Sequence, residues 1–534
     1  MSDQFIDKEI IALENGISHL INLTELSLDL ILDVRASNDS INSIAKGIKS
    51  LKNLEKLYAN LNIRSGQVLD ILTYIDSFNY LQNAELRIFG KNSYFKKINQ
   101  KINLDDQKTQ QKTKLKKNVN QKAKMNQIVQ VQNLWNLLFT SKQFQRISNS
   151  LTYLQQLQFL TLIYNQKNGF GPQSAKFLGN ALKSLHELLH LNLKIGNFNQ
   201  INQDGAYNLS QGIKSLSGLR SLQLYLEGCN IQRQGAILIG DSLSYLTRLK
   251  TLWLLIVQDK IQSDGAVAIG RAIKNLYDLN ELKIQIGEQN EIKKIGAYEI
   301  GVGMQFLTNL THLRLIIKDN NDIESDGISS ICKSISKMIY LKQGAIQIGD
   351  RLSYLISLRT LSLVILEDQI EDKGAIQIGR SFKFLSNLTN LNIKIGCNNT
   401  IQLKGACGIG EGIENLINLT KLSLAIDDFN NIESGGISKI CKGISNMKDL
   451  QYLNLQFGNN QIISASIKEI SLAIKHLEQL KKFQISIHIS EITSNYALEI
   501  VDLIRLLDTT ALNFNYEIKD YSIIHERQPK SIYN

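Results

Sequence analysis

The sequence predicts an α/β solenoid, in which a parallel sheet lines one side and helices line the other. Three observations predict it: a unit of about 30 residues recurs, one half of the unit has helical spacing, and the other half alternates. Units begin at Gly205, Gly235, Gly265, Gly296, Gly327, Gly374, Gly405 and Gly436, at steps of 30 or 31 where they are intact. A unit of this length cannot bury its apolar side alone, so neighbouring units stack.

The first half of each unit predicts a helix. In the unit that begins at Gly405, apolar residues fall three or four apart, at Ala406, Ile409, Ile413 and Leu416. The Gly-Ala pair at its start lets one helix lie close to the next, and glycine also relieves the turn that enters the helix.

The second half of each unit predicts a short strand. Leu422, Leu424 and Ile426 alternate with other residues, which is the period of a strand with one buried side. The same pattern predicts about 14–15 repeats, with degenerate first and last units that act as caps. The predicted strands are centred near Leu28, Ala59, Ile88, Leu162, Leu193, Leu224, Leu254, Ile284, Leu315, Leu363, Ile393, Leu424, Leu455 and Ile485, with a further one near Phe514.

The leucine spacing carries a resemblance to a known family. The segments that begin at Leu310 and Leu419 have the form LxxLxL. This pattern resembles leucine-rich repeats of the ribonuclease-inhibitor-like type over about residues 1–90 and 134–520. The resemblance implies a horseshoe with the sheet on its concave face and helices on its convex face. The chain departs from the family pattern, because Ile317 and Ile426 stand where the family has Asn or Cys, and the unit is slightly long.

Composition divides the chain into four parts. Residues 1–90 form N-terminal repeats with a cap, residues 134–520 form the main array, and residues 521–534 form a tail. Residues 91–133 form a Lys/Gln/Asn-rich insert with too few apolar residues for a core, so we predict disorder there. The insert holds most of the net charge of +11, because residues 96–127 contain ten lysines and only Asp105 and Asp106 as acids.

A long duplication disturbs the main array. Residues from Gln234 match residues from Gln343 at a constant offset of 109, and Gly327 and Gly344 lie only 17 residues apart. One unit near 327–344 therefore keeps its helix half and loses its strand half. Such a seam indicates either two repeats joined out of phase, by exchange or in the gene model, or an evolved hinge. Either origin predicts a break in the sheet near Met338–Gln343.

The cysteines and the start of the chain indicate a compartment. The five cysteines show neither a CxxC pair nor a disulfide framework, which favours a reducing environment. The first residues are charged rather than apolar, and no apolar run approaches the ~18 residues of a transmembrane helix. We therefore expect a soluble cytoplasmic protein.

Two motifs suggest chemistry and are rejected by the repeat register. His186 and His190 match the HExxH pattern of zinc proteases, which needs both histidines on one helix. The register places His186 at a helix end and His190 just before a strand. The glycine-rich segment Gly405–Gly412 falls inside a helix half rather than after a strand, where a phosphate loop would lie. We expect no catalytic residue, no metal and no cofactor.

The strand register instead points to a binding surface. Residues between the core positions of successive strands face the concave side, and one stretch there is rich in residue types found at binding hot spots. The candidate partner-binding residues are Lys194, Tyr225, Trp253, Leu255, Lys283, Arg314 and Ile316. The sequence thus predicts a non-catalytic scaffold that binds another protein through this face.

Three alternatives stay open. The first is a regulator of a small GTPase or of another enzyme, for which Arg35 after the first strand is a candidate residue. The second is a structural spacer in a larger assembly. The third is weak, nonspecific binding of an anion such as nucleic acid through the lysine-rich insert.

Overall fold

A computed structural model describes most of the array. It describes residues 141–489 except for residues 153, 156, 165–168, 198, 319–320, 347–357 and 459–463. Outside this range it describes the strands at residues 25–31, 56–63, 83–90, 126–133 and 513–520. The predicted tail 521–534, residues 91–125 of the predicted insert, and Arg35 lie outside the described residues.

The chain forms two compact units. The N-terminal unit comprises Met1–Gly169 with Ser184–Leu188. Its described elements are strands β1 (Glu25–Ile31), β2 (Lys56–Ile63), β3 (Asn83–Gly90), β4 (Asn126–Asn133) and β5 (Leu157–Tyr164), and helix α4 (Ser141–Thr152). The five strands are parallel and pair in chain order.

The C-terminal unit comprises Phe170–Lys183 and Leu189–Asn534. Its described strands are β6 (His190–Ile195), β7 (Ser221–Glu227), β8 (Thr251–Val257), β9 (Glu281–Ile286), β10 (His312–Ile317), β11 (Thr360–Ile365), β12 (Asn390–Ile395), β13 (Lys421–Ile426), β14 (Tyr452–Phe457), β15 (Lys482–Ile489) and β16 (Asn513–Asp520). They form one open parallel sheet in chain order.

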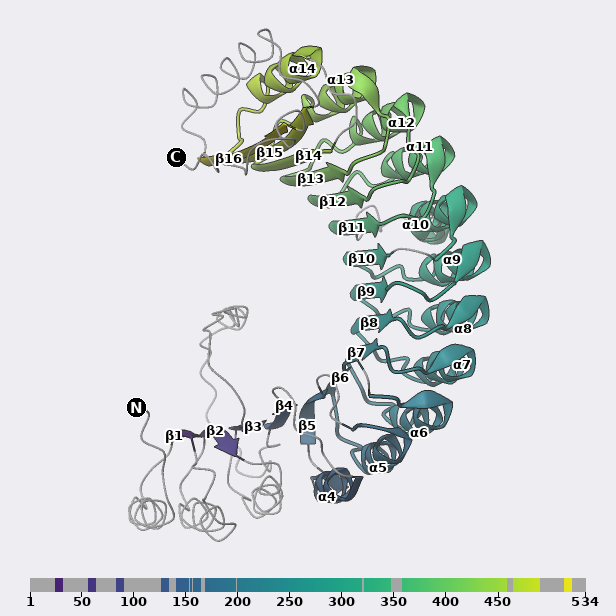
Figure 1. Ribbon diagram of the computed structural model, residues 1–534, viewed down its shortest axis with the longest axis vertical. Helices are drawn as coiled ribbons and strands as arrows, with labels where there is room; N and C mark the ends of the chain where they lie inside the picture. The colour runs from purple at the N-terminus through teal and green to yellow at the C-terminus, as the bar shows by residue number, and fades with distance from the viewer. Residues whose placement is uncertain are drawn as a thin grey trace. The chain divides into compact units, whose positions relative to one another are not determined.

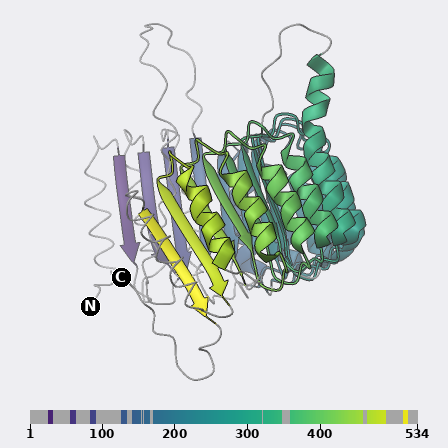
Figure 2. The same cartoon turned by 90° about the horizontal axis from the view of Figure 1, so that it is seen from above.

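Helices alternate with these strands. They are α5 (Pro172–Leu182), α6 (Asn202–Lys214), α7 (Gln232–Leu243), α8 (Gln262–Ile273), α9 (Lys293–Met304), α10 (Glu324–Ile346), α11 (Glu371–Phe382), α12 (Leu403–Ile413), α13 (Glu433–Ile444) and α14 (Ser464–Lys475). Within this unit the strands line the inner side of a curved stack and the helices line its outer side (Figure 1). Figure 2 shows the two layers from above. The predicted fold class, an α/β solenoid with strands and helices on opposite sides, is confirmed.

The core lies between the two layers. In β8, Leu252, Leu254 and Ile256 are buried, while the residues between them are only partly covered. In α12, Ala406, Ile409 and Ile413 are buried at the spacing predicted for the helix half. Each unit therefore buries one stripe of its helix against one side of its strand, and continuity along the stack completes the core.

Glycines allow the helices to lie close together. A Cβ added at Gly265 of α8 would lie 2.6 Å from Cβ of Ala236 on α7, and one added at Gly436 would lie 2.6 Å from Cβ of Ala406. The predicted role of the Gly-Ala pair, close approach of neighbouring helices, is thus confirmed.

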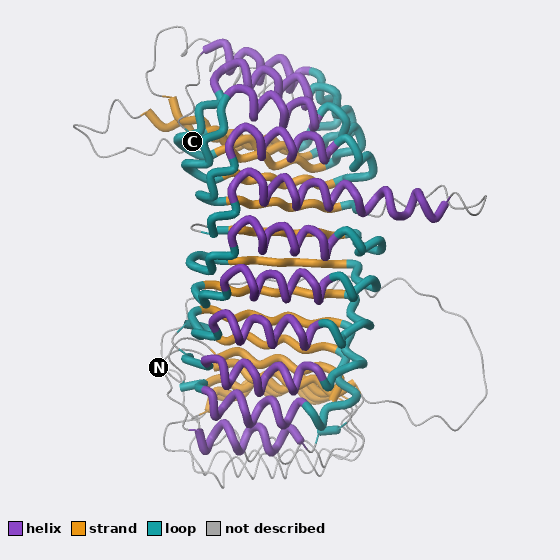
Figure 3. Tube along the Cα trace, turned by 90° about the vertical axis from the view of Figure 1, so that its right-hand side faces the viewer, coloured by secondary structure: helices purple, strands orange, loops and turns teal. Residues whose placement is uncertain are grey.

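The predicted break in the sheet near Met338–Gln343 is wrong. β10 and β11 pair residue for residue, from His312 with Thr360 to Ile317 with Ile365. The surplus residues extend α10 to 23 residues, and the extension projects beyond the ends of the neighbouring helices (Figure 3). The sheet stays continuous because the surplus falls on the helix side, where a longer helix leaves strand pairing unaffected.

The predicted insert is also too long. Residues 126–133 form β4, which pairs with β3 and β5. The segment combines Ile128, Val129 and Val131 with Gln and Asn, so its amide-rich composition resembles that of the insert although it forms a strand. In the described part of the chain no helix is both long and apolar enough to cross a membrane.

Candidate functional site

The strand register brings the predicted concave residues into two neighbouring rows. In the first row, Trp253 of β8 pairs with Lys283 of β9, which pairs with Arg314 of β10. In the second row, Lys194 of β6 pairs with Tyr225 of β7, which pairs with Leu255 of β8. We call Tyr225, Trp253, Leu255, Lys283 and Arg314 the central patch; Lys194 lies exposed at its edge.

Trp253 is held in place by two contacts with side chains of β9. Its Nε1–H donates a hydrogen bond of 2.8 Å to Oε1 of Glu281. The Lys283 ammonium lies 5.3 Å from the centre of the Trp253 ring, within the range of a cation–π interaction. The indole is therefore fixed and half-buried on the sheet, with part of its surface open to a ligand.

The two cations of the patch differ in their surroundings. Arg314 is exposed, while Lys283 is partly buried between Trp253 and Arg314. Burial lowers the pKa of Lys283, the neighbouring Arg314 charge lowers it further, and Glu281 opposes both. Among the described residues, neither cation forms a salt bridge.

The apolar side of the patch is only partly as predicted. Tyr225 and Leu255 are half-buried, and burial together with the Glu281 charge raises the pKa of the Tyr225 hydroxyl. Ile316, predicted to be part of the exposed surface, is only 6% exposed. It lies in the second row between Gln285 of β9 and Val364 of β11, and it adds to the packing of the face rather than to its contact surface.

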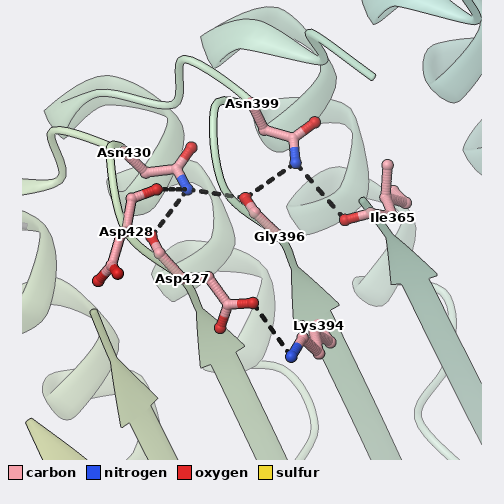
Figure 4. Close-up of polar contacts among 7 residues, drawn as sticks. All are labelled: Ile365, Lys394, Gly396, Asn399, Asp427, Asp428 and Asn430. Carbon is pink, nitrogen blue, oxygen red and sulfur yellow. Dashed lines mark hydrogen bonds and ion pairs between the residues drawn. The ribbon is translucent and has the colours of Figure 1, made fainter. Parts of the chain in front are cut away.

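A second polar array lies where the strands end. One buried residue per repeat occupies the loop that leads to the helix: Asn199, Cys229, Asp259, Asn290, Asn321, Asp368, Asn399 and Asn430. In Figure 4, Nδ2 of Asn399 donates to the carbonyl of Gly396 at 3.0 Å and to that of Ile365 at 3.5 Å. Nδ2 of Asn430 donates to the same Gly396 carbonyl and to that of Asp427, both at 3.0 Å. Each amide thus joins two repeats through their backbones.

This array corrects the predicted departure from the leucine-rich pattern. Isoleucines such as Ile317 and Ile426 stand where the family pattern leads one to expect Asn or Cys. The structure puts those isoleucines at the ends of buried strands, and Asn321 and Asn430 follow four residues later. The buried polar residue is therefore present in each of these repeats, but a longer loop places it further along the chain.

Asp259 is the exceptional member of this array. Its Oδ1 accepts a hydrogen bond of 3.2 Å from the Ile231 N–H, while Oδ2 is buried without a hydrogen-bond partner. Burial raises the pKa of Asp259 to about 7, against the lowering effect of three backbone N–H groups. Neighbouring Cys229 has a buried thiol whose pKa burial also raises, so this thiol stays protonated and is structural rather than reactive.

Neither rejected motif has the arrangement that its chemistry needs. His186 lies in a turn and His190 begins β6, so the two histidines share no helix. Gly405–Gly412 lies inside α12. Among the described residues no group of His, Cys, Asp or Glu could hold a metal ion.

Two features of the site were missed by sequence reasoning. Glu281 begins β9, where it pairs with Thr251 and lies diagonally from Trp253 on the same face, one position before the LxL core that marks the strand. Asp259 and Asp368 lie in loops after the ends of β8 and β11, so the alternation of the strands does not mark them.

No protein-family model matches the chain, and a search of curated proteins found no match.

Proposed function

We propose that this protein is a leucine-rich-repeat scaffold of the ribonuclease-inhibitor-like type that binds a protein partner through its central patch and does no chemistry itself. The family assignment is supported by the LxxLxL spacing, by the alternation of strands and helices, and by the buried Asn-rich array. Leucine-rich repeats commonly present extended concave surfaces to other proteins.

One observation carries the binding proposal. Four neighbouring strands, β7 to β10, bring an indole, a phenol, an aliphatic side chain and two cations onto one sheet face. Tyr, Trp and Arg are the residue types enriched at binding hot spots. On the same face, β11 to β15 carry amides and hydroxyls that bond to one another, as in the 2.8 Å bond from Asn392 to Ser362 and the 2.6 Å bond from Tyr452 to Gln484. The central patch therefore has the greater capacity for binding.

The test is affinity capture with matched variants. Trp253→Ala and Arg314→Ala should each weaken retention of a captured partner about 10-fold or more, as hot-spot truncations do. Tyr298→Ala is the control, because Tyr298 is a large aromatic on helix α9, 51% exposed and remote from the sheet face. Thermal unfolding of each variant separates loss of binding from loss of fold. Unchanged retention by both patch variants would show that the partner binds elsewhere.

A further inference from the structure

Two like charges lie side by side at the centre of the patch. Lys283 and Arg314 are direct partners on neighbouring parallel strands. Like charges directly opposite each other destabilise a sheet. The nearest acid, Glu281, already accepts the hydrogen bond of Trp253, and neither cation has a salt bridge within the described part of the chain. Glu281 offsets only part of the charge of the two cations, so the face keeps a net positive charge at this place.

The surroundings make this charge responsive to an anion. Lys283 is partly desolvated, and both burial and the Arg314 charge lower its pKa. A negative group placed between the two side chains would stabilise the charged form of Lys283 and offset the repulsion. Since the site is partly buried, that interaction would be screened less than one between fully exposed charges.

Within the first row, the positive charge is confined to Lys283 and Arg314. On either side of the pair, the row continues with Gln223 of β7 before Trp253, and with Ser362 of β11 and Asn392 of β12 after Arg314. These side chains are neutral. Trp253 is the direct partner of Lys283, and the apolar Leu255 of the second row lies diagonally from Lys283, beside Gln285. The arrangement fits an acidic side chain whose neighbours are apolar.

We propose that Lys283 and Arg314 together bind a carboxylate from an acidic segment of the partner, with Trp253 packing against the adjoining residues of that segment. This inference rests on the proposed function and specifies the partner's chemistry. A guanidinium binds a carboxylate through two parallel hydrogen bonds, and an ammonium adds a point charge from the other side.

The test uses a 20-residue poly-L-glutamate peptide and the emission of Trp253. The chain has two tryptophans, so Trp135→Phe leaves Trp253 as the reporter. A local reporter is needed because the ten lysines of residues 96–125 attract the same peptide. We expect a saturable change in Trp253 emission, and Lys283→Gln or Arg314→Gln should weaken it about 10-fold each.

Lys421→Gln is the matched control. Lys421 is an exposed lysine of β13 on the same sheet face, and its loss changes net charge equally. Its variant should keep the affinity within about 2-fold. Absence of a Trp253 response, or equal weakening by all three variants, would overturn the inference. A phosphoserine peptide that binds when poly-L-glutamate does not would overturn the assignment to a carboxylate.

The captured partner separates this inference from the proposed function. If Trp253→Ala releases the partner while Lys283→Gln and Arg314→Gln retain it, the scaffold function stands and the acidic segment does not. If all three variants retain the partner, both proposals fail.

Discussion

Asp259 occupies a buried loop position where most repeats have an Asn, and a carboxylate cannot donate the hydrogen bonds that the amide donates. At the equivalent position Asn290 donates from Nδ2 to the carbonyls of Ile256 and Gly287, both at 3.0 Å. An ionised Asp259 has no proton to donate, its Oδ2 lacks a partner, and the nearby Glu227 carboxylate disfavours its charge. The fold therefore favours the protonated acid.

We predict that this residue makes stability fall as pH rises. Below about pH 4 the carboxyl is protonated in both states. Between its ordinary value of 3.8 and about 7 only the folded state holds the proton, so each pH unit lowers the free energy of unfolding by about 1.4 kcal/mol. Above about pH 7 the loss is complete, on the order of 4 kcal/mol.

Asp259→Asn removes this loss because an amide stays neutral and can donate to a carbonyl, as Asn290 does. In urea denaturation the variant should match the wild type at pH 4 and exceed it by on the order of 4 kcal/mol at pH 8. Asp241→Asn, at an exposed carboxylate of α7, is the control and should leave the pH dependence unchanged. Equal pH profiles for Asp259→Asn and the wild type would contradict the prediction.

Gly240 tests whether glycine in the helices serves packing. A Cβ at this position of α7 would lie 2.7 Å from the carbonyl carbon of Ala268 in α8, closer than real contacts allow. Gly240→Ala should therefore lower the free energy of unfolding by about 1–3 kcal/mol through overpacking.

Helix propensity alone predicts the opposite sign, since alanine favours a helix over glycine by about 1 kcal/mol. Gly435→Ala in α13 is the matched variant, because its Cβ would meet only the end of the Leu403 side chain and the site is exposed. It should be neutral or stabilising in thermal denaturation. A stabilising Gly240→Ala would show that the helices can move apart.

At the scale of the element, α10 contains additional residues that the other described helices of the array lack. Its first part buries Ile328, Ile331, Cys332 and Ile335 in the stack, as the other helices do. The surplus follows these residues and precedes β11, whose register with β10 is complete. The pairing of β10 with β11 therefore does not require the additional residues.

Deleting residues 339–355 should leave the fold intact. The deletion restores the usual spacing of 17 residues between the repeat glycine and the first leucine of the strand, as from Gly436 to Leu453. Thermal unfolding should stay cooperative with a midpoint within a few degrees of the wild type, a change of less than about 1 kcal/mol. Removing the 17 residues 265–281 is the control, because it eliminates α8 and should abolish cooperative folding. Loss of folding in the first deletion would assign the surplus a structural role.

The spacing of apolar residues predicts the helices and strands well because it follows directly from which side of each element is buried. Leu252, Leu254 and Ile256 alternate because one side of β8 faces the core, and the same alternation of burial recurs in β7, β9, β12 and β14. The pattern failed where a tertiary contact decides the outcome. Ile316 is covered by its neighbours across strands, the seam is resolved by lengthening a helix, and Asn321 contacts the preceding repeat from a loop whose length varies. None of these depends on local period alone.

The sequence predicts which residues of the candidate site lie side by side on neighbouring strands, but not which of their side chains interact. Counting along the strands placed Trp253, Lys283 and Arg314 in one row, and their pairing is confirmed. The hydrogen bond from Trp253 to Glu281 depends on side-chain conformation, which sequence period does not determine.

At the scale of the whole molecule, charge and topology constrain how the lysine-rich segment can be tested. β3 and β4 are parallel, so the chain between Gly90 and Asn126 returns from the end of one strand to the start of the next. A parallel connection needs a dozen or more residues. Deleting residues 96–127 would leave five residues for this return and would remove the first two residues of β4. Loss of binding in such a deletion would therefore be uninterpretable.

Charge neutralisation at constant length avoids that difficulty. Replacing the ten lysines of residues 96–125 by glutamine lowers the net charge from +11 to +1. If this segment attracts anions, the wild type should bind a heparin column at low salt and elute by roughly 0.3 M, and the variant should pass through, because such binding depends on counterion release. The corresponding ten Lys→Arg replacements keep the charge and should restore retention. Retention that survives neutralisation would place the anion-binding surface on the repeats, where the basic central patch is the first candidate.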